Sequence, residues 1–199
     1  MESRLLKGTY GYLNRNRVHA WKKAALMLAA PLLIFLVGWY VHGTRENVMT
    51  VVAVVGCLPG CNQVVRAIMA SRYHSMDREL YEAVEKARGT CFALYENVFT
   101  SYEKTYYVDA IVLCGREIAG YSGAADLNEG AAAAHIRSML KKSSYKQNVK
   151  IYKNRDDFLN RVLSLSAGGA EQPPFNGDDR YPDLTRDEII RHLLMSISL

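Results

Sequence analysis

The sequence predicts a membrane α-helical hairpin followed by a small cytosolic α+β domain, an α/β sandwich. Two apolar runs, residues 24–41 and 48–70, lie only a few residues apart. Each is long enough to cross a hydrocarbon core of about 30 Å as a helix. The rest of the 199-residue chain is charged, rich in tyrosine, and alternates helical with strand-like patterns. That length accommodates the hairpin and one small domain.

The N-terminal segment, residues 1–23, is basic: six Lys or Arg residues face the single acid Glu2. Such an asymmetry favours a membrane surface over nucleic acid, and we expect the segment to lie on anionic headgroups. The first span, residues 24–41, is uncharged and would form about 27 Å of helix. Residue types that prefer the membrane interface stand at its two ends, namely Trp21, Lys22, Lys23, Trp39 and Tyr40.

The second span, residues 48–70, contains a small-residue motif and a polar inner half. Gly56 and Gly60 form a GxxxG pair, which predicts a close-packing face through which two copies self-associate. We expect Asn62 or Gln63 to hydrogen-bond across that face, and Arg66 to extend to the headgroups. An alternative is that these three polar residues line a pathway in a small channel or transporter subunit.

Charge predicts the orientation of the hairpin. Six basic residues precede the first span, Arg45 stands beside Glu46 in the link, and three arginines, at positions 66, 72 and 78, mark the end of the second span. Both termini are therefore expected to be cytoplasmic, in a multi-pass protein of the cell membrane. Four scattered cysteines without a CxxC pair indicate reduced thiols, with no zinc site and no cofactor.

The soluble part, residues 71–166, predicts the order helix, three strands, helix, strand, helix. We expect the first helix to be capped by Ser75 with Glu79, and helices to start near Asn128 and Asn154. Residues 91–101 fit a strand or a helix, and their aromatic and β-branched content favours a strand. A linker follows at 167–184. The amphipathic helix at 185–199 then opens with Thr185 and Glu188 as a capping box, and we expect it to dock on the domain, on another subunit or on the bilayer, in that order.

Two acidic residues are the candidates for catalysis: Asp109 on the second strand and Glu117 on the third. With the element order, they resemble the core of PD-(D/E)XK nucleases, a resemblance that implies a metal held by two acidic groups and a lysine. Here the lysine position is empty, because Ile118 and Ala119 follow Glu117. The resemblance therefore implies a degenerate or active metal-dependent nuclease as an alternative function.

A second resemblance covers most of the chain. The stretch GTRENVMTVVAVVGCLPGCNQVV and the Tyr-rich domain after it resemble an uncharacterised group of small two-span membrane proteins of Gram-positive bacteria. This resemblance implies a bacterial plasma membrane and no activity. A basic cluster between Lys141 and Arg155 is compatible with nucleic acid, lipid or nucleotide, but no nucleic-acid motif accompanies it.

With no complete catalytic set in the sequence, our leading hypothesis is a non-enzymatic, membrane-anchored protein. Its cytosolic domain would bind a partner, and its second span would self-associate. The expected partners are the lipid bilayer and either a second copy or another protein.

Overall fold

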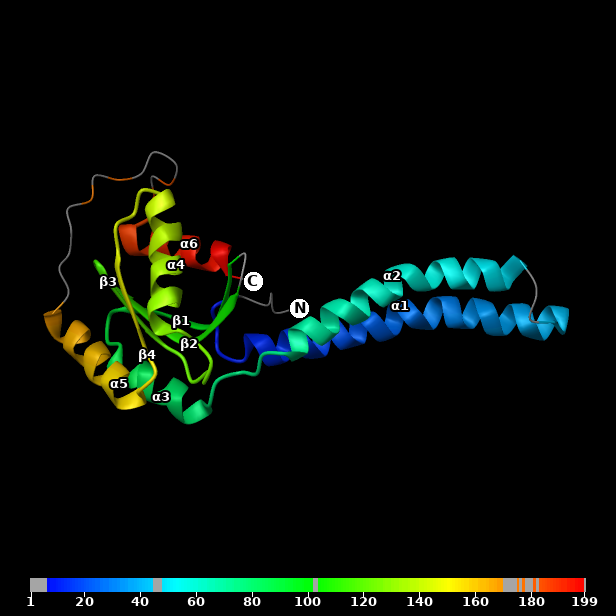
Figure 1. Ribbon diagram of the computed structural model, residues 1–199, viewed down its shortest axis with the longest axis horizontal. Coiled ribbons are helices and arrows are strands. Elements are labelled where there is room, and N and C mark those ends of the chain that lie inside the picture. Colours follow the sequence, from blue (N-terminus) through cyan, green and yellow to red (C-terminus); the bar gives the residue numbers. More distant parts are fainter. Residues whose placement is uncertain are drawn as a thin grey trace. The chain divides into compact units, whose positions relative to one another are not determined.

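The computed structural model describes residues 7–44, 48–101, 104–169, 175, 177, 181 and 183–198. The chain divides into two compact units (Figure 1). One unit is a helical hairpin, Leu13–His74, and the other joins Met1–Tyr12 to Ser75–Leu199. The link at residues 45–47 and most of the predicted linker at 167–184 lie outside the described residues.

The hairpin consists of α1 (Tyr12–His42) and α2 (Val48–Ser71). Both helices are long and apolar enough to cross a membrane, with mean hydropathies of 2.2 and 1.8 over their best windows. The second helix follows the predicted span closely. The first begins about twelve residues before its predicted span, because the helix continues through the basic segment, where no sustained helical period is visible in the sequence.

The small-residue face of α2 packs against α1. Ala53, Gly60 and Ala67 are buried on it. A Cβ added at Gly60 would lie 2.5 Å from Leu28 Cδ2, and one added at Gly56 would lie 3.3 Å from Pro31 Cβ. The GxxxG pair therefore lies against the other helix of the same chain, and self-association with a second copy stays a prediction.

The α+β unit follows the predicted succession of helices and strands, with shifted boundaries and a helical turn after α5 that was not predicted. Its elements are α3 (Arg78–Ala87), β1 (Phe92–Thr100), β2 (Thr105–Cys114), β3 (Glu117–Tyr121), α4 (Glu129–Lys142), β4 (Asn148–Tyr152), α5 (Arg155–Ser164), the helical turn η1 (Leu165–Gly169) and α6 (Arg186–Ile197). The strand assignment for residues 91–101 is confirmed. The sheet order is β1-β2-β3-β4, antiparallel except for the parallel pair β3 and β4.

Helices cover both faces of the sheet, which makes the unit a three-layer sandwich (Figure 1). On one face α4 and α6 bury Ile136 and Ile190 against strand residues such as Ile111. On the other, α3 and α5 bury Val84 and Phe158. Alternate strand residues point to opposite faces, so each strand contributes to both cores.

Three of the four predicted helix starts are confirmed. Asn128 and Asn154 accept hydrogen bonds from the backbone N–H groups of Ala131 and Asp156, and Thr185 with Glu188 forms the predicted capping box. The prediction for α3 is wrong. Its N-cap is Asp77, whose side chain makes no capping bond, because the helix begins two residues later than the Ser75 motif requires.

The C-terminal helix docks on the α+β unit, the first of the three sites we expected. Ile189, Ile190 and Leu194 are buried in the core. Arg186 Nη1 donates to the carbonyl of Gly115 at 2.9 Å, so α6 also holds the turn between β2 and β3. Beyond the helix, Ser198 forms a bridge with Phe99 at the edge of β1.

Cys91 and Cys114 form a disulfide, and the prediction that these thiols are reduced is wrong. Phe92 pairs with Leu113 in the β1–β2 ladder. The two cysteines stand one position beyond that pair, with Cα atoms 4.9 Å apart, a separation suited to a bridge. Pairing of two strands thus joins residues that look unrelated in the sequence. Cys57 and Cys61 are free.

Part of the basic N-terminal segment packs on the sheet instead of remaining separate from the domain. Tyr95 N–H donates to the carbonyl of Gly8, and Gly11 N–H donates to Glu96 Oε1, each at 2.9 Å. The ring of Tyr10 stacks on Tyr81, with centroids 4.5 Å apart. This segment covers an otherwise open edge of β1 and so protects unpaired backbone groups.

Candidate functional site

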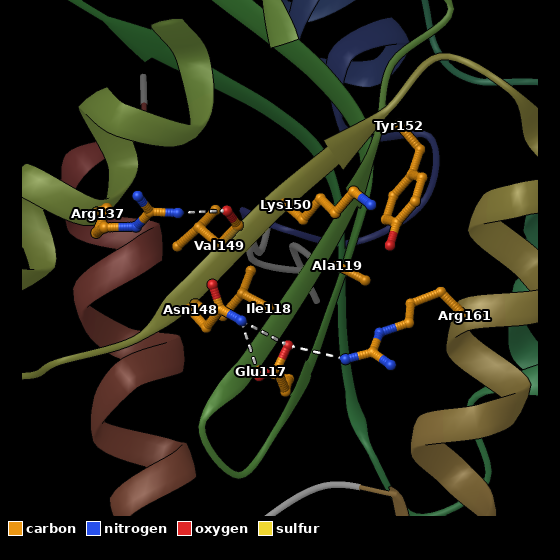
Figure 2. Close-up of a pocket in the computed structure, with 9 residues that line it drawn as sticks. All are labelled: Glu117, Ile118, Ala119, Arg137, Asn148, Val149, Lys150, Tyr152 and Arg161. Carbon is orange, nitrogen blue, oxygen red and sulfur yellow. Dashed lines mark hydrogen bonds and ion pairs between the residues drawn. The ribbon is translucent and has the colours of Figure 1, made fainter. Parts of the chain in front are cut away.

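A polar groove of about 330 Å³ opens along β4, the last strand of the sheet, between α4 and α5 (Figure 2). Its lining consists of Glu117, Ile118, Ala119, Arg137, Asn148, Val149, Lys150, Tyr152 and Arg161. The parallel pairing of β3 with β4 places Glu117 opposite Asn148 at the start of both strands. The groove therefore depends on the β3-α4-β4 crossover, which brings these two strands together.

The only carboxylate in the lining is held by two neighbours. Asn148 Nδ2 donates to both oxygens of Glu117, at 3.0 and 3.2 Å. Arg161 Nη2, from α5, lies 3.1 Å from Glu117 Oε2. The side chains of Arg161 and Glu117 are 38% and 23% exposed, so this ion pair remains open to solvent and to an incoming ligand.

Two further cations flank this pair. Lys150 Nζ lies 4.8 Å from the ring centroid of Tyr152, a cation–π geometry. Arg137 reaches from α4 and donates from Nη2 to the carbonyl of Val149 at 2.9 Å. Figure 2 shows Lys150 and Tyr152 above the Glu117–Arg161 pair, with Arg137 on the other side of β4.

The groove carries a net positive charge, since three cations line it with one carboxylate. Guanidinium groups offer paired donors that match the oxygens of phosphate or carboxylate groups. The half-buried ring of Tyr152 adds an apolar surface beside them. This combination suits the binding of a small ligand that carries an anionic group.

Asp109, the other predicted catalytic residue, lies away from the groove. In the β2–β3 ladder Cys114 pairs with Glu117, and Asp109 is five residues earlier on β2. Five strand residues span about 17 Å. The two carboxylates therefore do not converge, and among the described residues no group of three or more His, Cys, Asp or Glu side chains is arranged to hold a metal ion.

The surroundings of Asp109 explain why an acid stands in an apolar strand. Its Oδ2 accepts a hydrogen bond from Gly123 N–H at 2.7 Å. Burial raises the pKa of the carboxyl group, while the bonds from Gly123 and from the Tyr107 hydroxyl oppose that rise. Glu96, also buried, lies near enough to raise it further. Asp109 thus ties β2 to the loop after β3.

The residues predicted to pack or to lie at the membrane interface have distinct environments within the hairpin. Gly56 and Gly60 contact α1, whereas Asn62 is exposed and Gln63 is partly exposed. Arg66 is exposed on α2. At the same end, the indole N–H of Trp21 donates to Ser71 Oγ at 3.0 Å, and Lys22 and Lys23 are exposed beside it. Trp39 and Tyr40 are exposed near the far end.

Sequence reasoning missed most of the groove. From the predicted basic cluster, only Lys150 lines it, and Arg137, Asn148, Tyr152 and Arg161 were not singled out. One signal was available in the alternation of β4, where Asn148, Lys150 and Tyr152 share a face. Which helices flank that face depends on the fold.

Comparison with protein-family models, with curated protein sequences and with solved structures finds no match for this chain.

Proposed function

We propose that this protein is a membrane-anchored binding protein, whose α+β unit holds a small anionic ligand in the groove along β4. The observation that carries the proposal is that Arg137, Lys150 and Arg161, from two helices and a strand, all line one cavity, with Arg137 on the other side of β4 from Arg161. The two apolar helices supply the membrane anchor. The Glu117 carboxylate is already engaged by Arg161 and Asn148, which favours a role in shaping the groove over a role in chemistry.

We place the α+β unit on the cytoplasmic side. Basic residues precede the first span and follow the second, whereas the short link has one arginine beside one glutamate. This distribution favours cytoplasmic termini. The Cys91–Cys114 disulfide is more typical of an oxidising compartment. Charge near the spans directs insertion, so we give it priority over the disulfide in proposing the side of the membrane.

Membrane anchoring is tested by alkaline carbonate extraction of cells that express the full chain. We expect the protein to stay in the membrane pellet. Protease added outside intact spheroplasts should leave the α+β unit undigested, whereas protease added to inverted vesicles should remove it. Release into the carbonate supernatant would overturn the anchor, and digestion from outside would reverse the orientation.

Ligand binding is tested by isothermal titration of the detergent-solubilised full chain, with inorganic phosphate and with adenosine monophosphate, which adds a ring for Tyr152. We expect binding that weakens with salt and falls about fivefold or more in Lys150→Gln. Lys142→Gln is the matched control, because Lys142 is exposed at the end of α4 and lies outside the lining. Equal affinities of the two variants, or no binding of either probe, would refute the groove as an anion site.

A further inference from the structure

Three exposed cations stand near the cytoplasmic end of the hairpin, where neither helix has an acidic residue. Between residues 13 and 74, the only Asp or Glu is Glu46, in the link at the opposite end. Lys22 and Lys23 on α1 and Arg66 on α2 are all exposed. Any anion attracted to this end therefore meets no competing carboxylate on either helix.

Packing between the helices places Lys23 and Arg66 at nearly the same level. Gly56 packs against Pro31 and Gly60 against Leu28, which sets the antiparallel pairing of the two helices. Continued toward the cytoplasmic end, the same pairing brings Arg66 level with Lys22 and Lys23. This is the level at which the apolar run of α1 begins, so these cations lie where lipid headgroups would be.

Lys23 and Arg66 also lie on the same flank of the hairpin. Each immediately precedes a buried residue on the packed face of its helix, Ala24 on α1 and Ala67 on α2. One residue turns an α-helix by about 100°. In two antiparallel helices that face each other, the same backward step leads to the same side. Lys22, a further step back, points away from α2.

The flank continues into an apolar surface toward the centre of the span. Gln63, one turn before Ala67, lies on this side and is partly exposed. Beyond it are Met27, which is 39% exposed, and Pro59, which is also exposed. A charged end followed by an apolar track has the polarity of a phospholipid, with the phosphate at the cations and an acyl chain along the track.

From this arrangement we infer that Lys23, Arg66 and Gln63 form a binding site for the headgroup of an anionic phospholipid of the cytoplasmic leaflet. The inference rests on the membrane anchoring proposed above. The two cations bind the phosphate from both helices, and the Gln63 amide donates a further hydrogen bond. Such a site also holds the two helices together at the membrane surface, near the Trp21–Ser71 hydrogen bond.

The test uses the full chain with Trp39→Phe, which leaves Trp21 as the sole tryptophan of the chain. The protein is reconstituted in vesicles of phosphatidylcholine mixed with phosphatidylglycerol. In one set of vesicles the phosphatidylcholine is brominated, and in the other the phosphatidylglycerol, so that each lipid in turn quenches tryptophan fluorescence. We expect phosphatidylglycerol to be enriched around Trp21 over phosphatidylcholine. Each cation near the surface should contribute about fivefold, so Lys23→Gln and Arg66→Gln each reduce the enrichment by that factor and together abolish it.

Lys22→Gln is the matched control, because it removes the same charge one residue away but on the side turned from α2. It should leave most of the enrichment intact. An equal loss in Lys22→Gln and Lys23→Gln would mean diffuse attraction and would overturn the site, as would enrichment that persists in the double variant. Quenching of Trp21 by brominated phosphatidylcholine alone reports insertion, so loss of that signal would count against the anchor rather than the lipid site.

Discussion

Arg161 Nη2 lies 3.1 Å from Glu117 Oε2 and joins α5 to the first residue of β3 inside the groove. The pair sets the charge of the groove, because Glu117 is the only carboxylate in its lining. We therefore expect Glu117→Gln to strengthen anion binding severalfold by freeing the guanidinium of Arg161. The cost in stability should be below about 1 kcal/mol, since the pair is partly exposed. Isothermal titration with phosphate measures the anion affinity, and unfolding by urea measures the stability. Weaker phosphate binding by Glu117→Gln would contradict the role of Glu117 in limiting the positive charge of the groove.

A pH-dependent stability effect is expected at Asp109. Burial raises the pKa of its carboxyl group in the folded chain, so folding favours the protonated form. The contribution of this group to stability is then fully present at acidic pH and is lost as pH rises through the raised pKa. Asp109→Asn, which still accepts from Gly123 N–H, should stabilise the α+β unit at neutral pH, because it removes the cost of burying the charge.

The measurement for Asp109→Asn is thermal unfolding followed by the near-ultraviolet circular dichroism of tyrosines at several pH values. The advantage of the variant should shrink to nothing below the ordinary pKa of aspartate. If the variant were less stable at neutral pH, the prediction would be wrong. The hydrogen bonds from Gly123 and Tyr107 would then stabilise the ionised carboxylate by more than its burial costs.

The Cys91–Cys114 disulfide closes a sequence separation of 23 residues. A bridge that closes a loop of this size should stabilise the fold by roughly 3 kcal/mol, because it lowers the conformational entropy of the unfolded chain. Cys91→Ser with Cys114→Ser should lose that amount, and a reductant should cause the same loss in the native chain only. Alkylation followed by mass spectrometry of freshly lysed cells then gives the oxidised fraction. Thiols that remain alkylatable after mild oxidation of the folded protein would contradict the pairing.

Gly60 lies at a close approach between the two helices of the hairpin. Because an added Cβ would lie 2.5 Å from Leu28 Cδ2, Gly60→Leu should force α1 and α2 apart and destabilise the hairpin by about 1–3 kcal/mol. Val55→Leu places the same leucine side chain on an exposed part of α2, away from that contact, and should have little effect. Unfolding in sodium dodecyl sulfate, followed by far-ultraviolet circular dichroism, compares them.

Self-association of the second span stays a prediction, and the same variants bear on it. If Gly60→Leu abolished crosslinked dimers while leaving hairpin stability unchanged, the small-residue face would belong to an interface between copies. If Gly60→Leu instead destabilised the hairpin, the main role of the small-residue face would be the packing of Gly56 and Gly60 within one chain.

Local patterns were sufficient for most of the architecture. Apolar length predicted α2 almost to the residue, and the alternating aromatic and β-branched residues of 106–113 predicted the core of β2. The capping box at Thr185 and Glu188 marked the start of α6 correctly. These features depend on neighbours a few residues apart, which is why the sequence alone carries them. Where the signal was weak, as in the basic part of α1, the helix was missed.

What the sequence alone determined is therefore the pair of long apolar helices, the order of elements and the cationic end of the hairpin. Only the tertiary structure decided which of these residues meet. Strand register separated Asp109 from Glu117 and brought Cys91 to Cys114, and the crossover through α4 placed Glu117 beside Asn148, with Arg161 facing them from α5. Register and layer order depend on how the whole core packs, and no stretch of the chain encodes that packing by itself.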